Sequence, residues 1–279
     1  MKKAKKRLSK KQITAIVTVI VTILLTAFWT VFAYVTVNKV DANGYEYGKG
    51  TRYIAHRGYS DKYYQNTAEA FTAAAEEDFF QGIETDVWAT KDGVFVCAHD
   101  ENPFADKSVK IYERTYDEIK DLPLDMGKAE KADATLDYRI ATLEQYLHIV
   151  SGSQKYAFVE IKQKFSETDA RRLTDLCYAI NGRARTYFCS FHKKQIDYII
   201  AYEPLARTEL FASLVLPAFC FAEAGYNVGL NVRLLVTPAY VDLLHKKNSF
   251  CCAWTVTDKA TAERLESYGV DWITANGVL

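Results

Sequence analysis

The sequence predicts an α/β protein, a TIM-type (β/α)8 barrel with a small insertion, preceded by one N-terminal transmembrane helix. Strand-like and helix-like segments alternate between residues 51 and 279. This stretch of about 230 residues is the usual length of one eight-stranded barrel. Before it, residues 13–37 form an uncharged apolar run that is long enough to cross a bilayer as a helix.

The N-terminal region is divided sharply by charge. Residues 1–12 carry seven lysines and arginines and no acid, whereas residues 12–38 carry no charge. A cleaved signal peptide is the alternative, but its apolar region is shorter and ends at a small-residue cleavage site, which we do not find here. We therefore expect an uncleaved anchor at 13–37 and a linker at 38–50. Because basic flanks stay inside, residues 1–12 are predicted to be cytoplasmic and residues 51–279 extracellular, on the cell membrane.

The elements of the barrel follow from short apolar runs bounded by turn residues and from longer amphipathic runs. Nine strands are predicted for eight places, so one of them must be wrong or lie outside the barrel. Residues 101–140 have no clean period and are predicted to be the insertion. Asn66 and Ser166 are expected to cap helix starts, and Gly182 to follow a helix end. The predicted strands are 52–55, 82–87, 94–98, 156–161, 186–189, 208–211, 228–232, 250–255 and 272–274, and the predicted helices are 67–77, 142–150, 167–180, 193–201, 239–246 and 259–267.

The charge balance argues against nucleic acid as a partner. Residues 1–40 hold eight of the 35 lysines and arginines and none of the 35 acids, so the remainder has a net charge of −8. Such a surface repels the phosphate backbone of nucleic acid.

Six cysteines could form disulfides in an extracellular domain. Because most lie in apolar stretches without framework or zinc spacing, buried free thiols are the preferred interpretation.

Two of the predicted strands are too close together for a parallel connection. Only six residues separate Val87 from Val94, and Lys91-Asp92-Gly93 is a turn signal, so the two strands are predicted to form a hairpin. With Asp92-Gly93 as the turn, Asp86 would face His99. Glu84, Asp86 and His99 would then share one site.

Carboxylates on two strands suggest a cation site. Glu84 and Asp86 stand two residues apart on one strand and therefore point to the same face, and Glu160 can complete the set from another strand. Oxygen ligands of this kind suit calcium or magnesium. The alternative is a pair of solvated acids on a polar strand face, or, for Glu160 and Lys162, a buried ion pair.

Basic and aromatic residues at strand ends complete the candidate site. His56 and Arg57 follow the first strand, at the end where a barrel of this type builds its active site. An arginine can bind phosphate through two parallel hydrogen bonds, and Lys162 can hold another phosphate oxygen. Trp254 could pack against a glycerol or alcohol group, or could belong to the core. His148, His192 and His245 are interpreted as surface or packing residues.

The chain resembles the glycerophosphodiester phosphodiesterase family over residues 53–276. The resemblance implies a barrel that hydrolyses glycerophosphodiesters, small or lipid, to glycerol 3-phosphate and an alcohol. It also implies that His56 and His99 are the acid–base pair, that Glu84, Asp86 and Glu160 bind a divalent cation, and that Arg57 and Lys162 contact phosphate. The motifs that carry it are Ala55-His56-Arg57-Gly58, Asn66-Thr67, Glu84-Thr85-Asp86, Lys91-Asp92-Gly93, His99-Asp100, Thr142-Leu143-Glu144, Glu160-Ile161-Lys162, Trp254-Thr255 and Gly269-Val270-Asp271.

Three positions depart from the family pattern and leave the substrate open. Gln65 replaces a usual glutamate, Ala141 replaces a common proline, and Thr274 is followed by Ala275-Asn276 where the last strand of the family usually ends in Thr-Asp. None of them removes a proposed catalytic residue. Two alternatives therefore stay open: phospholipase-like hydrolysis of lysophospholipids or anchored glycerophosphate polymers, and a tethered glycerophosphate-binding module without turnover.

Overall fold

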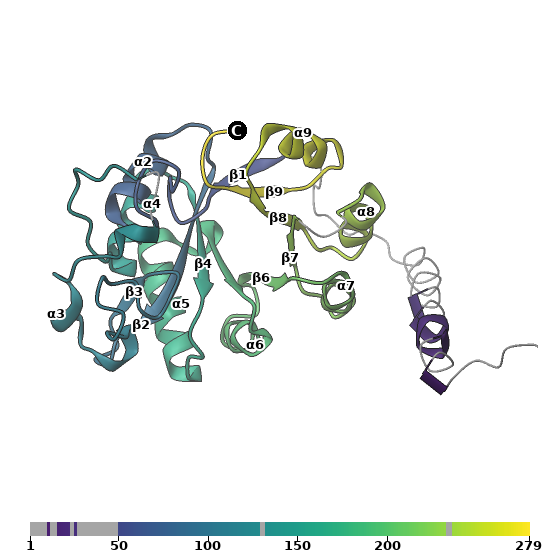
Figure 1. Ribbon diagram of the computed structural model, residues 1–279, viewed down its shortest axis with the longest axis horizontal. Coiled ribbons are helices and arrows are strands. Elements are labelled where there is room, and N and C mark those ends of the chain that lie inside the picture. Colours follow the sequence, from purple (N-terminus) through teal and green to yellow (C-terminus); the bar gives the residue numbers. More distant parts are fainter. Residues whose placement is uncertain (1–9, 12–15, 23–24, 27–49, 129–131, 233–235) are drawn as a thin grey trace, which may run out of the picture. The chain divides into compact units, whose positions relative to one another are not determined.

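A computed structural model of the chain describes residues 10–11, 16–22, 25–26, 50–128, 132–232 and 236–279 (Figure 1). The chain divides into two compact units, residues 1–43 and 44–279. The larger unit contains all nine strands of the described sheet.

Eight parallel strands close into a barrel, as predicted. β1 pairs with both β2 and β9, so the sheet has no free edge between them. Around the ring the order is β1-β9-β8-β7-β6-β5-β4-β2 (Figure 1). The strands are β1 (Arg52–Ala55), β2 (Gly82–Ala89), β4 (Tyr156–Ile161), β5 (Thr186–Ser190), β6 (Arg207–Ala212), β7 (Val228–Asn231), β8 (Cys251–Val256) and β9 (Trp272–Ala275).

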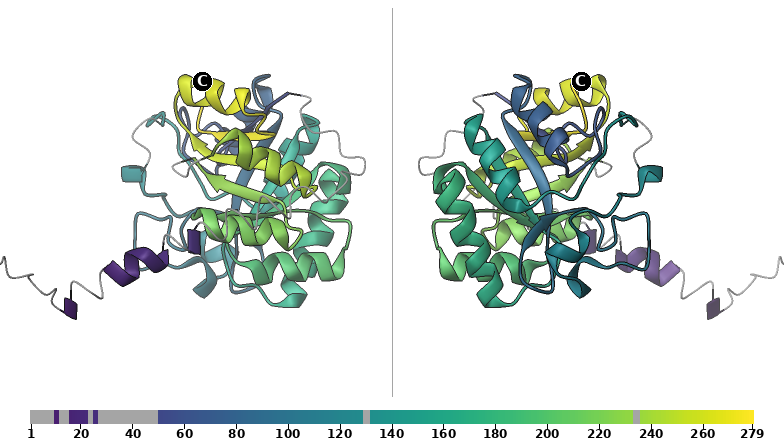
Figure 2. Two further views of the ribbon diagram at one scale, coloured as in Figure 1. Left: turned by 90° about the vertical axis from the view of Figure 1, so that its right-hand side faces the viewer. Right: turned by 90° about the vertical axis from the view of Figure 1, so that its left-hand side faces the viewer.

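Helices surround this ring on its outer side (Figures 1 and 2). One hydrophobic cluster lies between strands and helices, and a second, which includes Ile54, Phe158 and Trp272, packs side chains from several strands inside the barrel. The helices are α2 (Ala68–Glu76), α4 (Leu143–Gly152), α5 (Glu167–Asn181), α6 (Lys193–Tyr202), α7 (Val215–Glu223), α8 (Pro238–Lys246) and α9 (Lys259–Ser267), with a short 3-10 helix η3 (Arg183–Arg185) after α5.

Two of the three predicted helix-end residues are confirmed, one is wrong, and one helix was not predicted. Ser166 caps α5, and Gly182 follows it with a φ of 75°, as predicted. Thr67 rather than Asn66 caps α2, because Asn66 has a φ of 57° and turns its amide toward β2 instead. Helix α7 was not predicted, because its sequence is apolar almost throughout and shows no helical period.

The ninth strand lies outside the barrel, as part of the predicted hairpin. β3 (Phe95–Cys97) runs antiparallel to the end of β2, with Val87 opposite Cys97. The predicted register is wrong by one residue, since the backbone N–H of Ala98, not of His99, donates to the carbonyl of Asp86. The cause is a three-residue loop between Thr90 and Val94, in which Gly93 adopts a φ of 82°.

The insertion that follows β3 has a small hydrophobic core of its own. Phe104, Ile111, Ile119 and Leu124 are buried together there. Regular structure is short, which explains the absence of a period in the sequence. It consists of η1 (Ile111–Glu113), α3 (Tyr116–Ile119) and η2 (Met126–Lys128).

The predicted membrane span lies mostly outside the described residues. Of residues 13–37, only 16–22 and 25–26 are described, and they are helical. No helix within the described part of the chain is long and apolar enough to cross a membrane. Most of the predicted basic tail and nearly all of the linker are likewise not described.

Candidate active site

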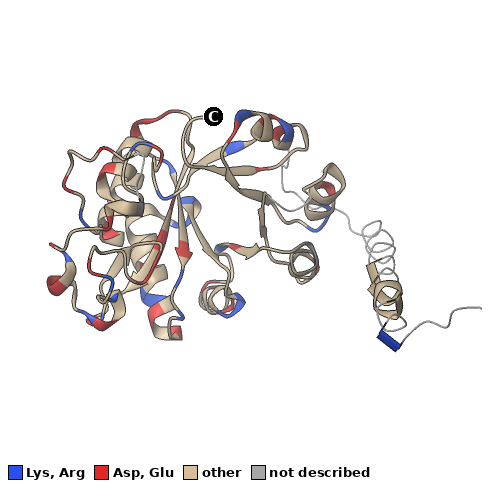
Figure 3. Ribbon diagram, viewed as in Figure 1, with Lys and Arg blue, Asp and Glu red and all other residues tan. Residues whose placement is uncertain are grey.

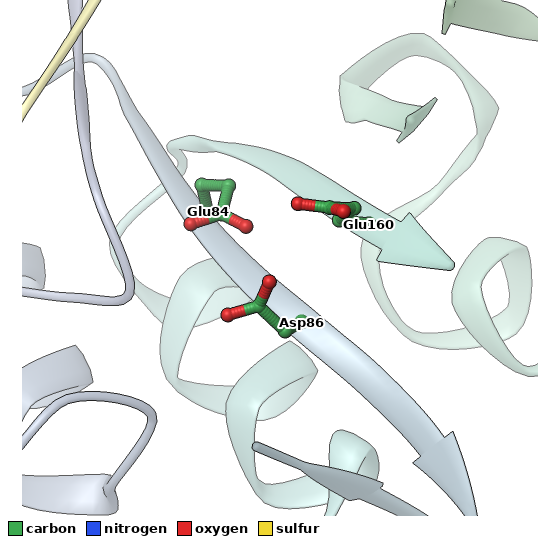
Figure 4. A group of neighbouring side chains, drawn as sticks. All are labelled: Glu84, Asp86 and Glu160. Carbon is green, nitrogen blue, oxygen red and sulfur yellow. The ribbon is translucent and has the colours of Figure 1, made fainter. Parts of the chain in front are cut away.

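Three buried carboxylates from two neighbouring strands lie close together (Figure 4). Glu84 and Asp86 extend from β2, and Glu160 lies on β4 in register with Asp86. One oxygen from each carboxylate lies within 4.8 Å of the others. Their exposed fractions are only 5, 0 and 7 %. The alternative of solvated acids is therefore wrong.

The charge of this cluster is unbalanced in a way that suits a cation. Burial, and then the charges of Asp86 and Glu160, raises the pKa of Glu84 well above its usual range. Burial likewise raises the pKa of Glu160 to about 8. Oε1 of Glu84 and Oδ1 of Asp86 are buried without a hydrogen-bond donor among the described residues. Three converging carboxylates, two of them with an oxygen that accepts no hydrogen bond, form a ligand set that fits a hard divalent cation.

Asp86 is the carboxylate of the cluster whose negative charge is best balanced by neighbouring cations. Burial favours its neutral form, but the charges of Arg57 and Lys162 outweigh burial and lower its pKa to about 2. Arg57 Nε lies 3.2 Å from Oδ2, Lys162 Nζ lies 3.5 Å from Oδ1, and the amide of Asn66 donates to Oδ2 at 2.8 Å. These contacts hold both cationic side chains beside the carboxylates. Lys162 also pairs with Glu160 at 3.0 Å.

Local backbone geometry places Arg57 at the end of β1. Its φ is 58°, and its backbone N–H donates to Oε2 of Glu84 at 2.9 Å. Its Nη1 donates to the side-chain oxygen of Gln65 at 2.6 Å. The next residue, Gly58, has a φ of 79°, and a Cβ there would lie 2.6 Å from the carbonyl carbon of Ala70. The turn therefore requires glycine, which is why the chain can bend from β1 toward α2.

The two histidines have chemically different partners. Nδ1 of His56 lies 2.7 Å from the amide oxygen of Asn276, and Nδ1 of His99 lies 2.9 Å from the carboxylate of Asp100. In both rings this leaves Nε2 for other contacts. Burial, and then the charge of Arg57, lowers the pKa of His56 to about 3. Burial and Arg57 also lower the pKa of His99, but Asp86 and Asp100 oppose that shift.

A pocket joins these residues to three aromatic side chains, Phe191, Phe211 and Trp254, which we call the aromatic wall. Although the predicted hairpin register was wrong by one residue, His99 still belongs to the site, because its side chain lines the same pocket as Glu84. Asp86 lies beneath this surface and is fully buried. Figure 3 shows acidic positions on β2 and β4, whereas β7 and β8 carry no charge. The lining residues are His56, Arg57, Glu84, His99, Glu160, Lys162, Phe191, Phe211, Trp254, Thr255 and Thr274.

Several contributors were not predicted from the sequence. Phe191 and Phe211 resemble ordinary strand residues, and only their place at strand ends could have indicated a pocket. Asp100 and Asn276 were noticed as motif positions, but not as partners of histidine rings. Of the other histidines, His148 and His192 are exposed and His245 bonds to Asp271 at 2.8 Å, in agreement with surface and packing roles.

The cysteines are free thiols as predicted, but the prediction that they are buried is wrong for one of the six. Cys220 is exposed, and the other five are buried. Two of the buried thiols, Cys189 and Cys252, belong to the cluster inside the barrel.

Comparison with known proteins identifies the family. The model of the glycerophosphoryl diester phosphodiesterase family matches residues 56–278. The chain belongs to this family. It is therefore an enzyme, a glycerophosphodiester phosphodiesterase, and the resemblance noted from its motifs is confirmed.

Individual relatives agree with this assignment. A glycerophosphodiester phosphodiesterase from Caldanaerobacter subterraneus is 27 % identical over 237 residues, which cover 80 % of this chain and 93 % of that protein. A crystal structure of a glycerophosphodiester phosphodiesterase from Parabacteroides distasonis is 25 % identical, with a TM-score of 0.65 and coverage of 81 % and 93 %. A phosphodiesterase from Oleispira antarctica, in complex with the product sn-glycerol-3-phosphate, shares the fold at 18 % identity, with a TM-score of 0.69 and coverage of 81 % and 93 %.

Proposed function

We propose that the pocket hydrolyses glycerophosphodiesters to glycerol 3-phosphate and an alcohol with the help of a divalent cation, with His56 as general base and His99 as general acid. The observation that carries this assignment is the difference between their partners, a neutral amide for His56 and a carboxylate for His99. The product complex of the Oleispira protein supports glycerol 3-phosphate as a ligand of this fold.

The charged side of the pocket would bind the phosphate. Arg57 and Lys162 line it and present cationic groups there. Glu84, Asp86 and Glu160 would hold calcium or magnesium. When bound, such an ion supplies positive charge beside the phosphate and stabilises the charge that develops on its oxygens.

His56 is suited to accept a proton. An amide oxygen can only accept a hydrogen bond, so Nδ1 of His56 carries the ring proton and Nε2 presents a lone pair. Its low pKa keeps the ring neutral at physiological pH. Nε2 would therefore take the proton of the attacking hydroxyl, which belongs either to water or to the neighbouring glycerol carbon. Attack by the glycerol hydroxyl would give a cyclic phosphodiester, and a water molecule would then open its ring to give glycerol 3-phosphate.

His99 is suited to donate a proton. Burial and the charge of Arg57 lower the pKa of His99, and the carboxylates of Asp86 and Asp100 oppose that shift. The anionic phosphodiester would add negative charge that favours the imidazolium form further. Nε2 would then protonate the oxygen of the departing alcohol. In this assignment the acidic limb of a bell-shaped pH–rate profile reports His56 and the alkaline limb reports His99.

Two variants test which histidine has which role. Asn276→Asp places a carboxylate beside His56 and should move the acidic limb of the kcat/KM profile to higher pH. Asp100→Asn removes the carboxylate beside His99 and should move the alkaline limb to lower pH. The readout is glycerol 3-phosphate released from glycerophosphocholine by the full chain in detergent. Exchange of the two limbs between the variants would reverse the roles.

Controls separate catalysis from folding and from metal binding. His56→Ala and His99→Ala should each abolish release, while circular dichroism shows an unchanged fold. Release should also require added calcium or magnesium and stop with chelator. Full activity in chelator would refute the cation, and near-normal activity in either alanine variant would refute that histidine's role.

We also propose that residues 13–37 anchor the enzyme in the cell membrane, with the N-terminus inside. The described helical residues support this, since Ile16, Val17 and Val19 are 45, 52 and 57 % exposed despite being apolar. Cys220 offers a test because its thiol is the exposed one. A membrane-impermeant maleimide should label it on intact cells, and Cys220→Ser should abolish that labelling. Labelling only after lysis would place the domain inside.

A further inference from the structure

The guanidinium of Arg57 is held by two side chains of different charge. Its Nε lies 3.2 Å from Oδ2 of Asp86, and its Nη1 donates to Oε1 of Gln65 at 2.6 Å. Because an arginine can only donate hydrogen bonds, the oxygen of the Gln65 amide is the atom that faces it. The side chain of Arg57 is 19 % exposed and lines the pocket, so it is fixed from two directions while part of it faces the ligand.

Gln65 itself lies outside the pocket. It does not belong to the described lining of the pocket, and it lines a smaller cavity instead, together with His99 and Asp100. Any effect of Gln65 on a bound phosphate is therefore transmitted through Arg57, both by the orientation of the guanidinium and by the charge beside it.

The amide of Gln65 is neutral, and this decides the net charge of the site. Arg57 and Lys162 with the three ionised carboxylates of the cluster leave one negative charge. A bound divalent cation, whose carboxylate ligands must be ionised, turns this into one positive charge. The two histidines add none when neutral. A glutamate at position 65 would bring the loaded site to zero.

Substrate and product respond differently to that charge. A glycerophosphodiester carries one negative charge on its phosphate. Glycerol 3-phosphate is a phosphomonoester and carries two at about pH 8, since its second pKa lies near 6. One unit of charge near a partly buried phosphate changes affinity about tenfold for each charge on the ligand. The extra positive charge therefore favours the product over the substrate.

We infer that Gln65 is a positioning residue that fixes Arg57 without cancelling its charge, so that the cation-loaded enzyme binds glycerol 3-phosphate more tightly than its diester substrate and is inhibited by it. This inference rests on the proposed diesterase function. Hydrolysis would slow as the product accumulates, and it would resume when a reaction that consumes the phosphomonoester removes it.

A purely structural role for Gln65 is the alternative. Gln65 lies between Tyr64 and Asn66, which are both buried in the turn before α2. If Gln65 only maintained this turn or the orientation of Arg57, any substitution would weaken the binding of a monoanion and of a dianion by the same factor. The two roles therefore differ in how the effect depends on ligand charge.

Two constants measure that dependence. The full chain in nanodiscs, loaded with calcium or magnesium at about pH 8, is titrated with glycerol 3-phosphate in a calorimeter, which gives a Kd without turnover. Initial rates of glycerol 3-phosphate release give the KM for glycerophosphoglycerol, whose alcohol is uncharged. In the wild type the Kd for the product should lie below the KM for the diester.

Three variants separate charge from position. Gln65→Glu should raise the Kd about hundredfold and the KM about tenfold. Gln65→Met, which keeps the length and adds no charge, should raise both by one common factor. Gln154→Glu is the matched control, because Gln154 also accepts a hydrogen bond from an arginine, Arg185, but precedes β4 at the amino end of the barrel. It should change neither constant.

The outcomes are distinct. If diesters are hydrolysed but Gln65→Glu changes the two constants by the same factor, or changes neither, the inference is wrong while the diesterase remains. A wild-type Kd above the KM, or an unequal effect of Gln65→Met like that of Gln65→Glu, would also overturn it. If the folded, cation-loaded chain hydrolyses no diester, the proposed function fails. A Kd about a hundredfold higher in Gln65→Glu would then still support the role of Gln65 in product binding, and an unchanged Kd would overturn that as well.

Discussion

Glu209 is a buried carboxyl group whose removal should stabilise the protein. It lies on β6 and is 1 % exposed. The thiol of Cys189 donates to its Oε2 at 3.6 Å, and its Oε1 has no hydrogen-bond donor among the described residues. Burial raises the pKa of Glu209 to about 7. We expect Glu209→Gln, which keeps the shape and removes the charge, to relieve this cost.

The magnitude and sign follow from proton linkage. A pKa near 4.5 in the unfolded chain and about 7 in the folded one corresponds to a cost of about 3 kcal/mol. Below pH 4.5 the carboxyl is protonated in both states and nothing is lost. As the pH rises toward 7 the unfolded chain releases its proton first, so wild-type stability falls, and above 7 the full cost is present.

Urea unfolding of the full chain at pH 4.5, 6 and 8 measures this directly. The free-energy difference between Glu209→Gln and wild type isolates Glu209, because all other titrating groups are common to both. It should be near zero at about pH 4.5 and grow to about 3 kcal/mol in favour of the variant near pH 8. Glu113→Gln, at an exposed position, should show no such trend. A difference that stays constant across this pH range would refute the reasoning.

Three further outcomes are expected. Gly58→Ala should lower the free energy of unfolding by about 1–3 kcal/mol, since its Cβ would clash with Ala70; wild-type stability in thermal unfolding would contradict this. Glu160→Gln should raise the cation concentration needed for half-maximal activity about tenfold or more, and an unchanged titration would argue against ligation. In the native protein a thiol reagent should react quickly with Cys220 alone, and fast reaction of several thiols would show that the barrel interior is open.

Much of the fold could be predicted because local pattern and tertiary structure agree. β1 and β4 have the predicted bounds, since each apolar run is closed by turn residues or charges that cannot enter the core. Helix α7 was not predicted, because the sequence Val215–Glu223 is apolar on nearly every side. A period can be read only where one face of a helix is polar.

The charged residues of the site could be predicted from the sequence, but the hydrogen-bond partners of its histidines could not. Glu84 and Asp86 share a face by strand geometry alone, and the position of Arg57 after a strand places it at the same end of the barrel. The partner of each histidine depends on contacts that no spacing reveals, since Asn276 lies 220 residues from His56. The predicted register of the hairpin was wrong for a local reason. A glycine with a positive φ occurs in both two- and three-residue loops, so the sequence does not distinguish them.

The two sides of the pocket come from different parts of the chain. The groups proposed for chemistry lie between residues 56 and 162, on β1, β2, β4 and the hairpin, whereas the aromatic wall lies between residues 191 and 254. A crossover between two such genes near residue 175 would therefore exchange the aromatic side of the pocket while keeping its titratable side. It would also exchange Asn276, the partner of His56, so recombination varies recognition and keeps catalysis only when both parents supply the same side chain at that position.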